Sequence, residues 1–321
     1  MAAARRRVAA RTAAPGGMLL LAAALGTALA LSVAVETSAA ARTCFGAAAR
    51  DTRRPCENTS RSVFPARNTA GFAPADACRQ IREDPSPVCT FGVSSRRASR
   101  HVALVGDSHA LHWRAALHAV ARRERWRGFS LTAPACFFSA AVGNLPAGLR
   151  EACVPWYRSA RAWFRRHPEV STVFVSQKAD TPVVAPRGRT ASAVRIAGFR
   201  RAWRSLPRSV KRVVVIRDVP DPADDMFECV ERVVAAGQEP PGPACATPRS
   251  AALRWDYAVS AAARSTRFRH VDLTPFFCDE QRCFPVVGGV RVYNDVLGHI
   301  TVAYARTLAP YLRREIRRVL R

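Results

Sequence analysis

Lysine is almost absent from this sequence, and acidic residues are few. Only Lys178 and Lys211 are lysines, although the chain has 50 Lys+Arg against 24 Asp+Glu and a formal net charge of +26. Nearly all of the positive charge is therefore arginine, spread along the chain and not collected in one stripe. We interpret it as solvated surface charge, with binding of an anionic polymer as the alternative. Because no nucleic-acid-binding motif is present, we expect no nucleic-acid partner.

The chain also has no Cys-x-x-Cys pair, which argues against a zinc site, and we predict neither a metal nor a cofactor. It has 10 cysteines, an even number that favours disulfides in an exported protein. Sequence alone does not prove their connectivity. The spacing suggests pairing between neighbours: Cys44–Cys56, Cys78–Cys89, Cys136–Cys153, Cys229–Cys245 and Cys278–Cys283.

Only one long apolar run occurs, so we expect a single span at most and no multi-helix membrane domain. The run covers Met18 to Val35 and follows a basic, acid-free segment. Two outcomes fit residues 1–41: a signal peptide cleaved near Ala41, or an uncleaved signal-anchor helix. Both place the rest of the chain outside the cytoplasm, either secreted or attached to the cell membrane by a single pass.

Beyond this segment the composition divides the chain in two. Residues 42–100 are rich in Pro, Arg, Ala and Ser, and we interpret them as a disulfide-pinned lead-in. Residues 101–321 alternate apolar strands with amphipathic helices, which predicts a mainly parallel sheet covered on both faces. The predicted strands are 101–106, 129–132, 172–176, 212–217 and 268–272, and the predicted helices are 109–126, 154–167, 191–206, 249–265 and 300–319. Two insertions, 133–152 and 218–248, follow strand ends and are expected near the ligand crevice.

The strand 101–106 ends at Gly106 and is followed by Asp107, Ser108 and a helix. A serine between the carboxyl end of a strand and a helix points into the crevice where open α/β sheets bind ligands. This position suits a nucleophile. The alternative is that Asp107 and Ser108 only cap the helix.

The motif Gly106-Asp107-Ser108-His109-Ala110, together with Asp295 and His299 before the last helix, resembles the SGNH/GDSL hydrolase superfamily. More narrowly, the chain resembles the SGNH domain fused to, or encoded beside, acyltransferase-3 membrane proteins. Asp272-Leu273-Thr274 and the Cys278/Cys283 pair support this narrower match. The resemblance covers roughly residues 44–320. It implies a three-layer α/β/α sandwich with a five-stranded, flavodoxin-like sheet.

The resemblance also implies a serine mechanism. Ser108 is the expected nucleophile, and His299 is the expected base, because imidazole titrates near neutral pH. Asp295 is the candidate for orienting that imidazole. In the superfamily the aspartate lies three residues before the histidine, whereas Asp295 lies four before it.

The sequence offers three candidate donors for the oxyanion hole. The Ser108 N–H is one candidate. The superfamily adds an asparagine after the third strand, but this chain has no Gly-x-Asn there, and Gln177 stands in its place. Asn144, in the preceding insertion, is a further candidate. The histidines of the first helix, His109, His112 and His118, do not share one face and do not predict a metal site.

We therefore expect an exported serine esterase or O-acyltransferase that acts on an envelope polysaccharide or glycolipid. The reaction is transfer of an acetyl-like group or its removal, and transfer would require a separate acyltransferase-3-type membrane protein to supply the acyl group. The alternative is a non-catalytic glycan-binding module that keeps the SGNH fold.

Overall fold

A computed structural model of the chain describes residues 44–73, the backbone of 79–81, and residues 88–321. The predicted apolar segment from Met18 to Val35 and the predicted partner of Cys89, Cys78, lie outside the described residues. Within the part that is described, no helix is both long and apolar enough to cross a bilayer.

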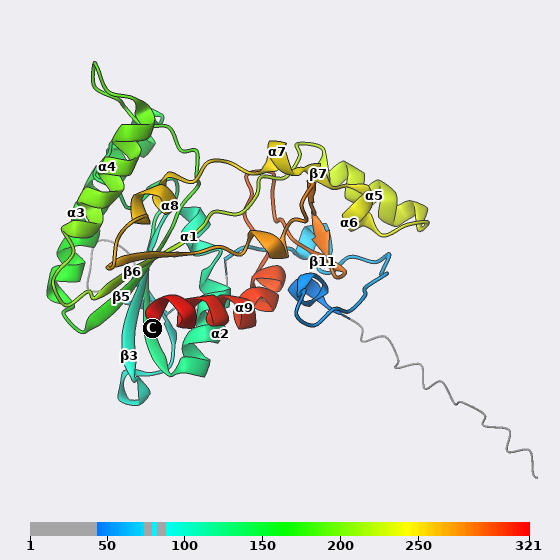
Figure 1. Cartoon of the computed structure of the whole chain (residues 1–321), viewed down its shortest axis with the longest axis horizontal. Helices are drawn as coiled ribbons and strands as arrows, with labels where there is room; N and C mark the ends of the chain where they lie inside the picture. The colour runs from blue at the N-terminus through cyan, green and yellow to red at the C-terminus, as the bar shows by residue number, and fades with distance from the viewer. Residues whose placement is uncertain (1–43, 74–78, 82–87) are drawn as a thin grey trace, which may run out of the picture. The chain divides into compact units, whose positions relative to one another are not determined.

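A seven-stranded sheet forms the centre of the fold, in the order β1-β2-β4-β3-β5-β6-β8. Its strands β3, β5 and β6 are labelled in Figure 1. Five of these strands, β4, β3, β5, β6 and β8, run parallel in the flavodoxin-like order. They are the five strands predicted from sequence. Their bounds are Trp126–Thr132 (β4), Arg100–Gly106 (β3), Val170–Ser176 (β5), Arg212–Ile216 (β6) and Phe268–Val271 (β8).

Two antiparallel strands, β1 (Arg79–Ile81) and β2 (Val88–Gly92), extend this sheet beyond β4. The expected number of five strands was therefore too low by two. Both strands come from the predicted lead-in and contain 3 and 5 residues. Segments this short carry too few alternations to be distinguished from a loop by periodicity.

Helices cover both faces of the sheet, which confirms the predicted three-layer sandwich. In β3, Val102 and Leu104 face the core beneath α2 (Arg114–Glu124) and α9 (Val302–Leu320). Ala103 and Val105 face the opposite core. That core lies beneath α3 (Ala147–Arg166), α4 (Ala191–Arg204) and α8 (Tyr257–Ala262). A strand buried on both faces reads as a continuous apolar run, as in a parallel sheet.

Two predicted helices are each divided in the structure. The helix expected at 109–126 consists of α1 (Ser108–Leu111) and α2, separated at His112 and Trp113. The helix expected at 249–265 consists of α7 (Arg249–Ala252) and α8. The side chain of Asp256 accepts hydrogen bonds from the N–H groups of the first turn of α8, which starts a new helix there.

The helix expected at 154–167 begins earlier, at Ala147, and contains Pro155 in its interior. The expected start was therefore seven residues too late. A helix that continues through Pro155 is not expected from sequence, because proline is unfavourable in a helix interior. The insertion 218–248 folds into α5 (Met226–Ala236) and α6 (Pro241–Ala244). The remaining strands are short: β7 (Thr247–Pro248), β9 (Arg282–Cys283), β10 (Val286–Val287) and β11 (Val290–Arg291).

Four of the neighbour pairings suggested by the sequence are disulfides in the structure: Cys44–Cys56, Cys136–Cys153, Cys229–Cys245 and Cys278–Cys283. Each closes a short loop. Disulfides persist in oxidising compartments, so these bridges indicate an extracytoplasmic location.

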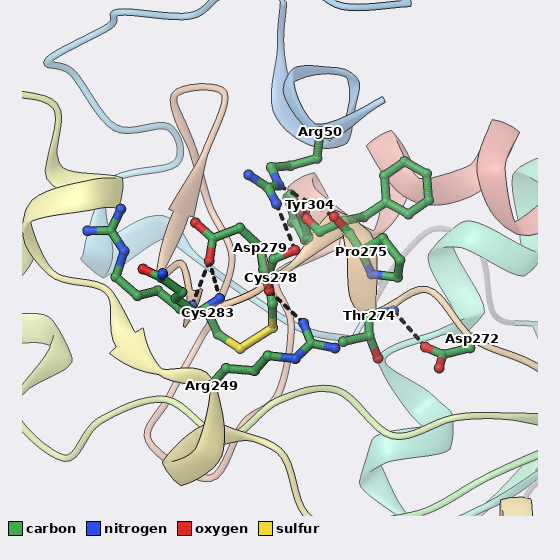
Figure 2. The surroundings of a disulfide bond; sticks show 12 residues. Arg50, Arg249, Asp272, Thr274, Pro275, Cys278, Asp279, Cys283 and Tyr304 are labelled. Atoms are coloured by element: carbon green, nitrogen blue, oxygen red, sulfur yellow. Dashed lines mark hydrogen bonds between the residues drawn. A yellow bond between two sulfur atoms is a disulfide. The ribbon is translucent and has the colours of Figure 1, made fainter. Parts of the chain in front are cut away.

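The Cys278–Cys283 bridge lies where the lead-in meets the C-terminal part of the fold (Figure 2). The guanidinium of Arg50 donates a hydrogen bond of 2.7 Å to the carbonyl of Cys278. Arg249 donates to the carbonyl of Asp279 at 2.6 Å, and the Tyr304 hydroxyl of α9 donates to the carbonyl of Phe276. These bonds hold the segment from Phe276 to Asp279, which lies in the stretch between β8 and α9 that also carries Asp295 and His299.

Gly106, the last residue of β3, provides a test of this packing. It has φ +150°, and a Cβ there would lie 1.9 Å from the backbone carbonyl of Ser176 in β5. We expect Gly106→Ala to lower the free energy of unfolding by at least about 2 kcal/mol, because neither backbone can move away within a packed sheet.

Gly148→Ala is the matched control, since nothing lies within 4 Å of its Cβ position and it is in helix α3. Its effect should stay within about 1 kcal/mol, because alanine favours a helix over glycine. Urea denaturation of both variants measures the difference. Equal stability of the two variants would show that the close approach at Gly106 is not a constraint.

Candidate active site

Ser108 is the first residue of α1 and follows directly on the end of β3. The preceding residue, Asp107, is the N-cap, and its Oδ1 accepts the His109 N–H at 2.8 Å. Its Oδ2 accepts the Lys178 N–H from the loop after β5 at 3.0 Å. Asp107 is buried and bridges two loops, as expected of a turn-forming residue and not of a catalytic acid. Because Ser108 begins a helix, its own N–H has no intrahelical acceptor.

His299 lies against Ser108, although 191 residues separate them in the sequence. Its Nε2 is 2.7 Å from the Ser108 Oγ, and its Nδ1 is 2.7 Å from the Asp295 Oδ2. An ionised carboxylate only accepts hydrogen bonds, so the proton of the neutral imidazole belongs on Nδ1. Nε2 is then free to accept the hydrogen bond that the Ser108 hydroxyl donates.

The loop Asn294–His299 accommodates the extra residue between the aspartate and the histidine. The Asp295 Oδ1 accepts the N–H groups of Leu297 and His299, at 3.1 and 3.2 Å. Gly298, with φ +92°, allows the tight turn that this requires. A backbone bridge between Tyr293 and Ile300 closes the loop at its base. A spacing of four residues thus still lets the carboxylate reach the imidazole.

The electrostatics of Asp295 favour its ionised form. Its partial burial would raise the pKa of the carboxyl, but the hydrogen bonds and electrostatic interaction with His299, together with the amide of Asn294, outweigh this. The pKa of Asp295 is therefore held below its ordinary value. The ring of Phe72 stacks on the His299 ring, with 4.4 Å between centroids, and covers one face of the imidazole.

A second pair of a histidine and an aspartate, His109 with Asp218, is buried beside the pair of His299 with Asp295. The His109 Nδ1 is 2.7 Å from the Asp218 Oδ1, and the rings of His109 and His299 have centroids 4.9 Å apart. Burial would lower the pKa of His109, but the charge and hydrogen bond of Asp218 raise it overall. Sequence reasoning did not identify Asp218. The available signal was its position just after β6, at the same edge of the sheet as Ser108.

The other two histidines of the first helix are placed differently. His112 is fully buried, and its Nδ1 accepts the Ile300 N–H at 3.4 Å. Burial lowers the pKa of His112 well below its ordinary value, and the neighbouring His109 and His299 lower it further, so His112 stays neutral. It does not line the cavity beside Ser108. The Nδ1 of His118 faces the Gly92 N–H, 3.4 Å away. No cluster of potential metal ligands occurs in the described ranges.

A cavity of about 510 Å³ opens beside Ser108, and the side chains of Ser108, His109 and His299 contribute to its wall. Neither of the side-chain candidates for the oxyanion hole lines this cavity. Gln177 is buried, and Asn144 is exposed. The loop after β4 lines it instead, and there Ala135 has φ +59°, a left-handed conformation that is uncommon for alanine.

The chain belongs to the family of SGNH domains fused to AT3 domains, whose model matches residues 75–314. No curated protein matches the chain.

Among solved structures, the chain is similar to the periplasmic domain of a lipopolysaccharide acetyltransferase from Salmonella serovar Paratyphi A. The identity is 14%, the match covers 70% of this chain and 90% of that chain, and the TM-score is 0.54. At this identity the similarity supports the fold. A carbohydrate esterase family 2 enzyme with a carbohydrate-binding domain, from Myceliophthora fergusii, matches with 11% identity over 71% of this chain and 69% of that chain, at a TM-score of 0.37.

Asp256 is buried next to Asp218 and accepts a hydrogen bond from its backbone N–H. We expect the titration of Asp256 to make the stability of the protein depend on pH. Its Oδ2 accepts the Asp218 N–H at 3.0 Å, and burial raises the pKa of Asp256 from 3.8 to about 6. Between these values the folded chain binds more protons than the unfolded chain. Raising the pH through this window should therefore lower the free energy of unfolding, by up to about 3 kcal/mol.

Urea denaturation at several pH values between 4 and 7 tests this, with Asp256→Asn as the comparison because asparagine cannot titrate. The wild type should lose stability relative to the variant as the pH rises. Parallel pH profiles for the two proteins would contradict the assignment.

Proposed function

We propose that this protein is a serine-dependent acyl-ester enzyme that acts on a carbohydrate of the cell envelope. Ser108 is the nucleophile, His299 the general base and Asp295 the group that orients the imidazole. The observation that carries the proposal is the continuous hydrogen-bond chain Asp295–His299–Ser108, with both links at 2.7 Å, beside an open cavity.

The geometry supports the following sequence of steps. The Ser108 Oγ attacks the carbonyl carbon of an ester while Nε2 of His299 takes its proton. The ionised Asp295 stabilises the resulting imidazolium and keeps Nδ1 protonated. The proton then passes to the departing alkoxide, which leaves an acyl group on the Ser108 Oγ. A sugar hydroxyl or water then attacks the acyl carbon while His299 takes its proton. The bond from that carbon to the Ser108 Oγ breaks, and His299 returns the proton to Oγ.

Stabilising the tetrahedral oxygen requires donors aimed at it, and each such donor is worth roughly 3–4 kcal/mol. We assign the Ser108 N–H to this role. A second donor from the backbone at Ala135 would explain why a non-glycine residue keeps a left-handed conformation in the cavity wall. This assignment replaces Gln177 and Asn144, which do not line the cavity.

Membership of a family of SGNH domains fused to AT3 domains supports transfer of an acyl group over hydrolysis. The similarity to a lipopolysaccharide acetyltransferase domain agrees with an envelope glycan as acceptor. In this scheme a separate acyltransferase-3-type membrane protein supplies the acyl group. The N-terminal apolar segment would hold the domain at the membrane or direct its secretion.

A non-catalytic glycan-binding module is the second candidate. One observation favours it: neither Gln177 nor Asn144 offers a side-chain amide to the cavity, in contrast to the superfamily pattern. A binding module would turn over no ester, and Ser108→Ala would then have no activity to remove. An enzyme would turn over an ester and lose that activity on the substitution.

Ser108→Ala should lower kcat/KM for a small aryl ester by at least about a thousandfold, because the acyl acceptor of the first step is lost. The exposed Ser94→Ala is the matched control and should behave as the wild type. The release of 4-nitrophenol from 4-nitrophenyl butyrate measures both. Turnover that is unchanged in a folded Ser108→Ala variant would refute the assignment.

Asp295→Asn should lower kcat by about a hundred- to ten-thousandfold without large changes in KM. Asparagine keeps the shape but lacks the charge that selects the Nδ1–H tautomer. Steady-state kinetics with the same ester measures this. If Asp295→Asn retained full kcat, another group would have to orient His299.

A further inference from the structure

The cavity beside Ser108 is much larger than an acetyl group requires. Its volume of about 510 Å³ falls within the range of roughly 300–1,000 Å³ in which proteins bind drug-sized ligands. A two-carbon acyl group on the Ser108 Oγ would leave most of this space unfilled. The size of the cavity therefore raises the question of what else it holds.

Apolar side chains from several separate segments form most of its wall. They are Leu111 of α1, Leu145 and Leu149 on either side of the start of α3, Leu297 of the histidine loop, and Phe72 and Pro134. Leu149 and Leu297 are 41% and 59% exposed. Large apolar side chains that gather at the mouth of a cavity usually mark a surface covered by a ligand.

Among the polar side chains of the wall, those of Lys178, Thr181 and Asp107 are already hydrogen-bonded within the protein. The Lys178 Nζ donates to the Asp221 carboxylate at 2.9 Å and to the Leu297 carbonyl at 3.3 Å. The Thr181 hydroxyl donates to the Lys178 carbonyl at 3.2 Å. Asp107, as described above, accepts two backbone N–H groups. A sugar needs unpaired donors and acceptors for its hydroxyls, whereas a hydrocarbon chain does not.

We propose that this cavity binds the hydrocarbon chain of an acyl group longer than acetyl. The acyl carbonyl carbon lies at the Ser108 Oγ and the chain extends along Leu111, Leu145 and Leu149. The sugar hydroxyl approaches from the open side. The inference rests on the proposed acyl-ester function of Ser108, and it narrows the substrate class to esters whose acyl chain is longer than acetyl.

The chemistry of the step is the same as for any ester. A bond forms between the Ser108 Oγ and the acyl carbon, and the bond from that carbon to the donor oxygen breaks. The Ser108 proton goes to His299 and then to the departing oxygen. Burial of the chain adds binding energy that a shorter acyl group lacks. This energy corresponds to a gain in kcat/KM of about three- to fourfold per buried methylene.

A series of 4-nitrophenyl esters tests the inference with the full-length protein: acetate, butyrate, hexanoate and octanoate, each below its critical micelle concentration. We expect kcat/KM to rise about three- to fourfold per added methylene until the cavity is filled. A flat series, or one that falls from acetate, would overturn the chain-binding inference and leave the proposed function intact. Failure to turn over any ester, or equal turnover by Ser108→Ala, would overturn the proposed function and the inference with it.

Leu149→Gln gives a second measurement. It should lower kcat/KM for octanoate by about three- to tenfold more than for acetate, because an amide replaces part of the apolar wall. Val154→Gln is the matched control: Val154 is 37% exposed on the same helix but does not line this cavity. Its ratio of octanoate to acetate turnover should equal that of the wild type. Equal ratios in Leu149→Gln and Val154→Gln would also overturn the inference.

Discussion

The site depends on two hydrogen bonds that the buried carboxylate of Asp107 accepts. One of its oxygens accepts the His109 N–H at the start of α1, and the other accepts the Lys178 N–H in the loop after β5. It thereby ties together the two loops that flank the point where the order of the parallel strands reverses. Open α/β sheets bind ligands at this point. With these loops fixed, Ser108 has one position relative to the rest of the sheet edge.

The second half of the site, Asp295 and His299, comes from the C-terminal part of the chain. The loop Asn294–His299 is closed at its base by the Tyr293–Ile300 bridge, and Thr301 then caps α9. The Cys278–Cys283 disulfide and the hydrogen bonds around it hold the preceding segment (Figure 2). Packing of α9 against α2 completes the arrangement (Figure 1). Because rigid elements support both halves, a 2.7 Å contact between Ser108 and His299 does not require a flexible segment to close.

The sequence predicted the parallel part of the sheet well because buried strands such as Val213-Val214-Val215-Ile216 carry a strong apolar signal. The candidate site residues came from the resemblance of the motif around Ser108 and the late Asp295 and His299, not from periodicity. Periodicity could not find β1 and β2, which are too short, nor the helix break at Asp256, which depends on a side-chain cap. The pair of His109 with Asp218 also escaped detection, since it depends on a contact across the edge of the sheet. The size and apolar wall of the cavity arise from side chains of distant segments and have no local sequence signature.

The proposed reaction requires Ser108 to be an activated nucleophile. Labelling with diethyl 4-nitrophenyl phosphate, a serine-reactive phosphate ester, tests it most directly, because reaction requires the hydroxyl to be activated and accessible. We expect one diethylphosphoryl group per chain, mapped by mass spectrometry to Ser108, with much slower labelling in His299→Asn. A folded protein that is not labelled, or is labelled at another residue, would contradict it.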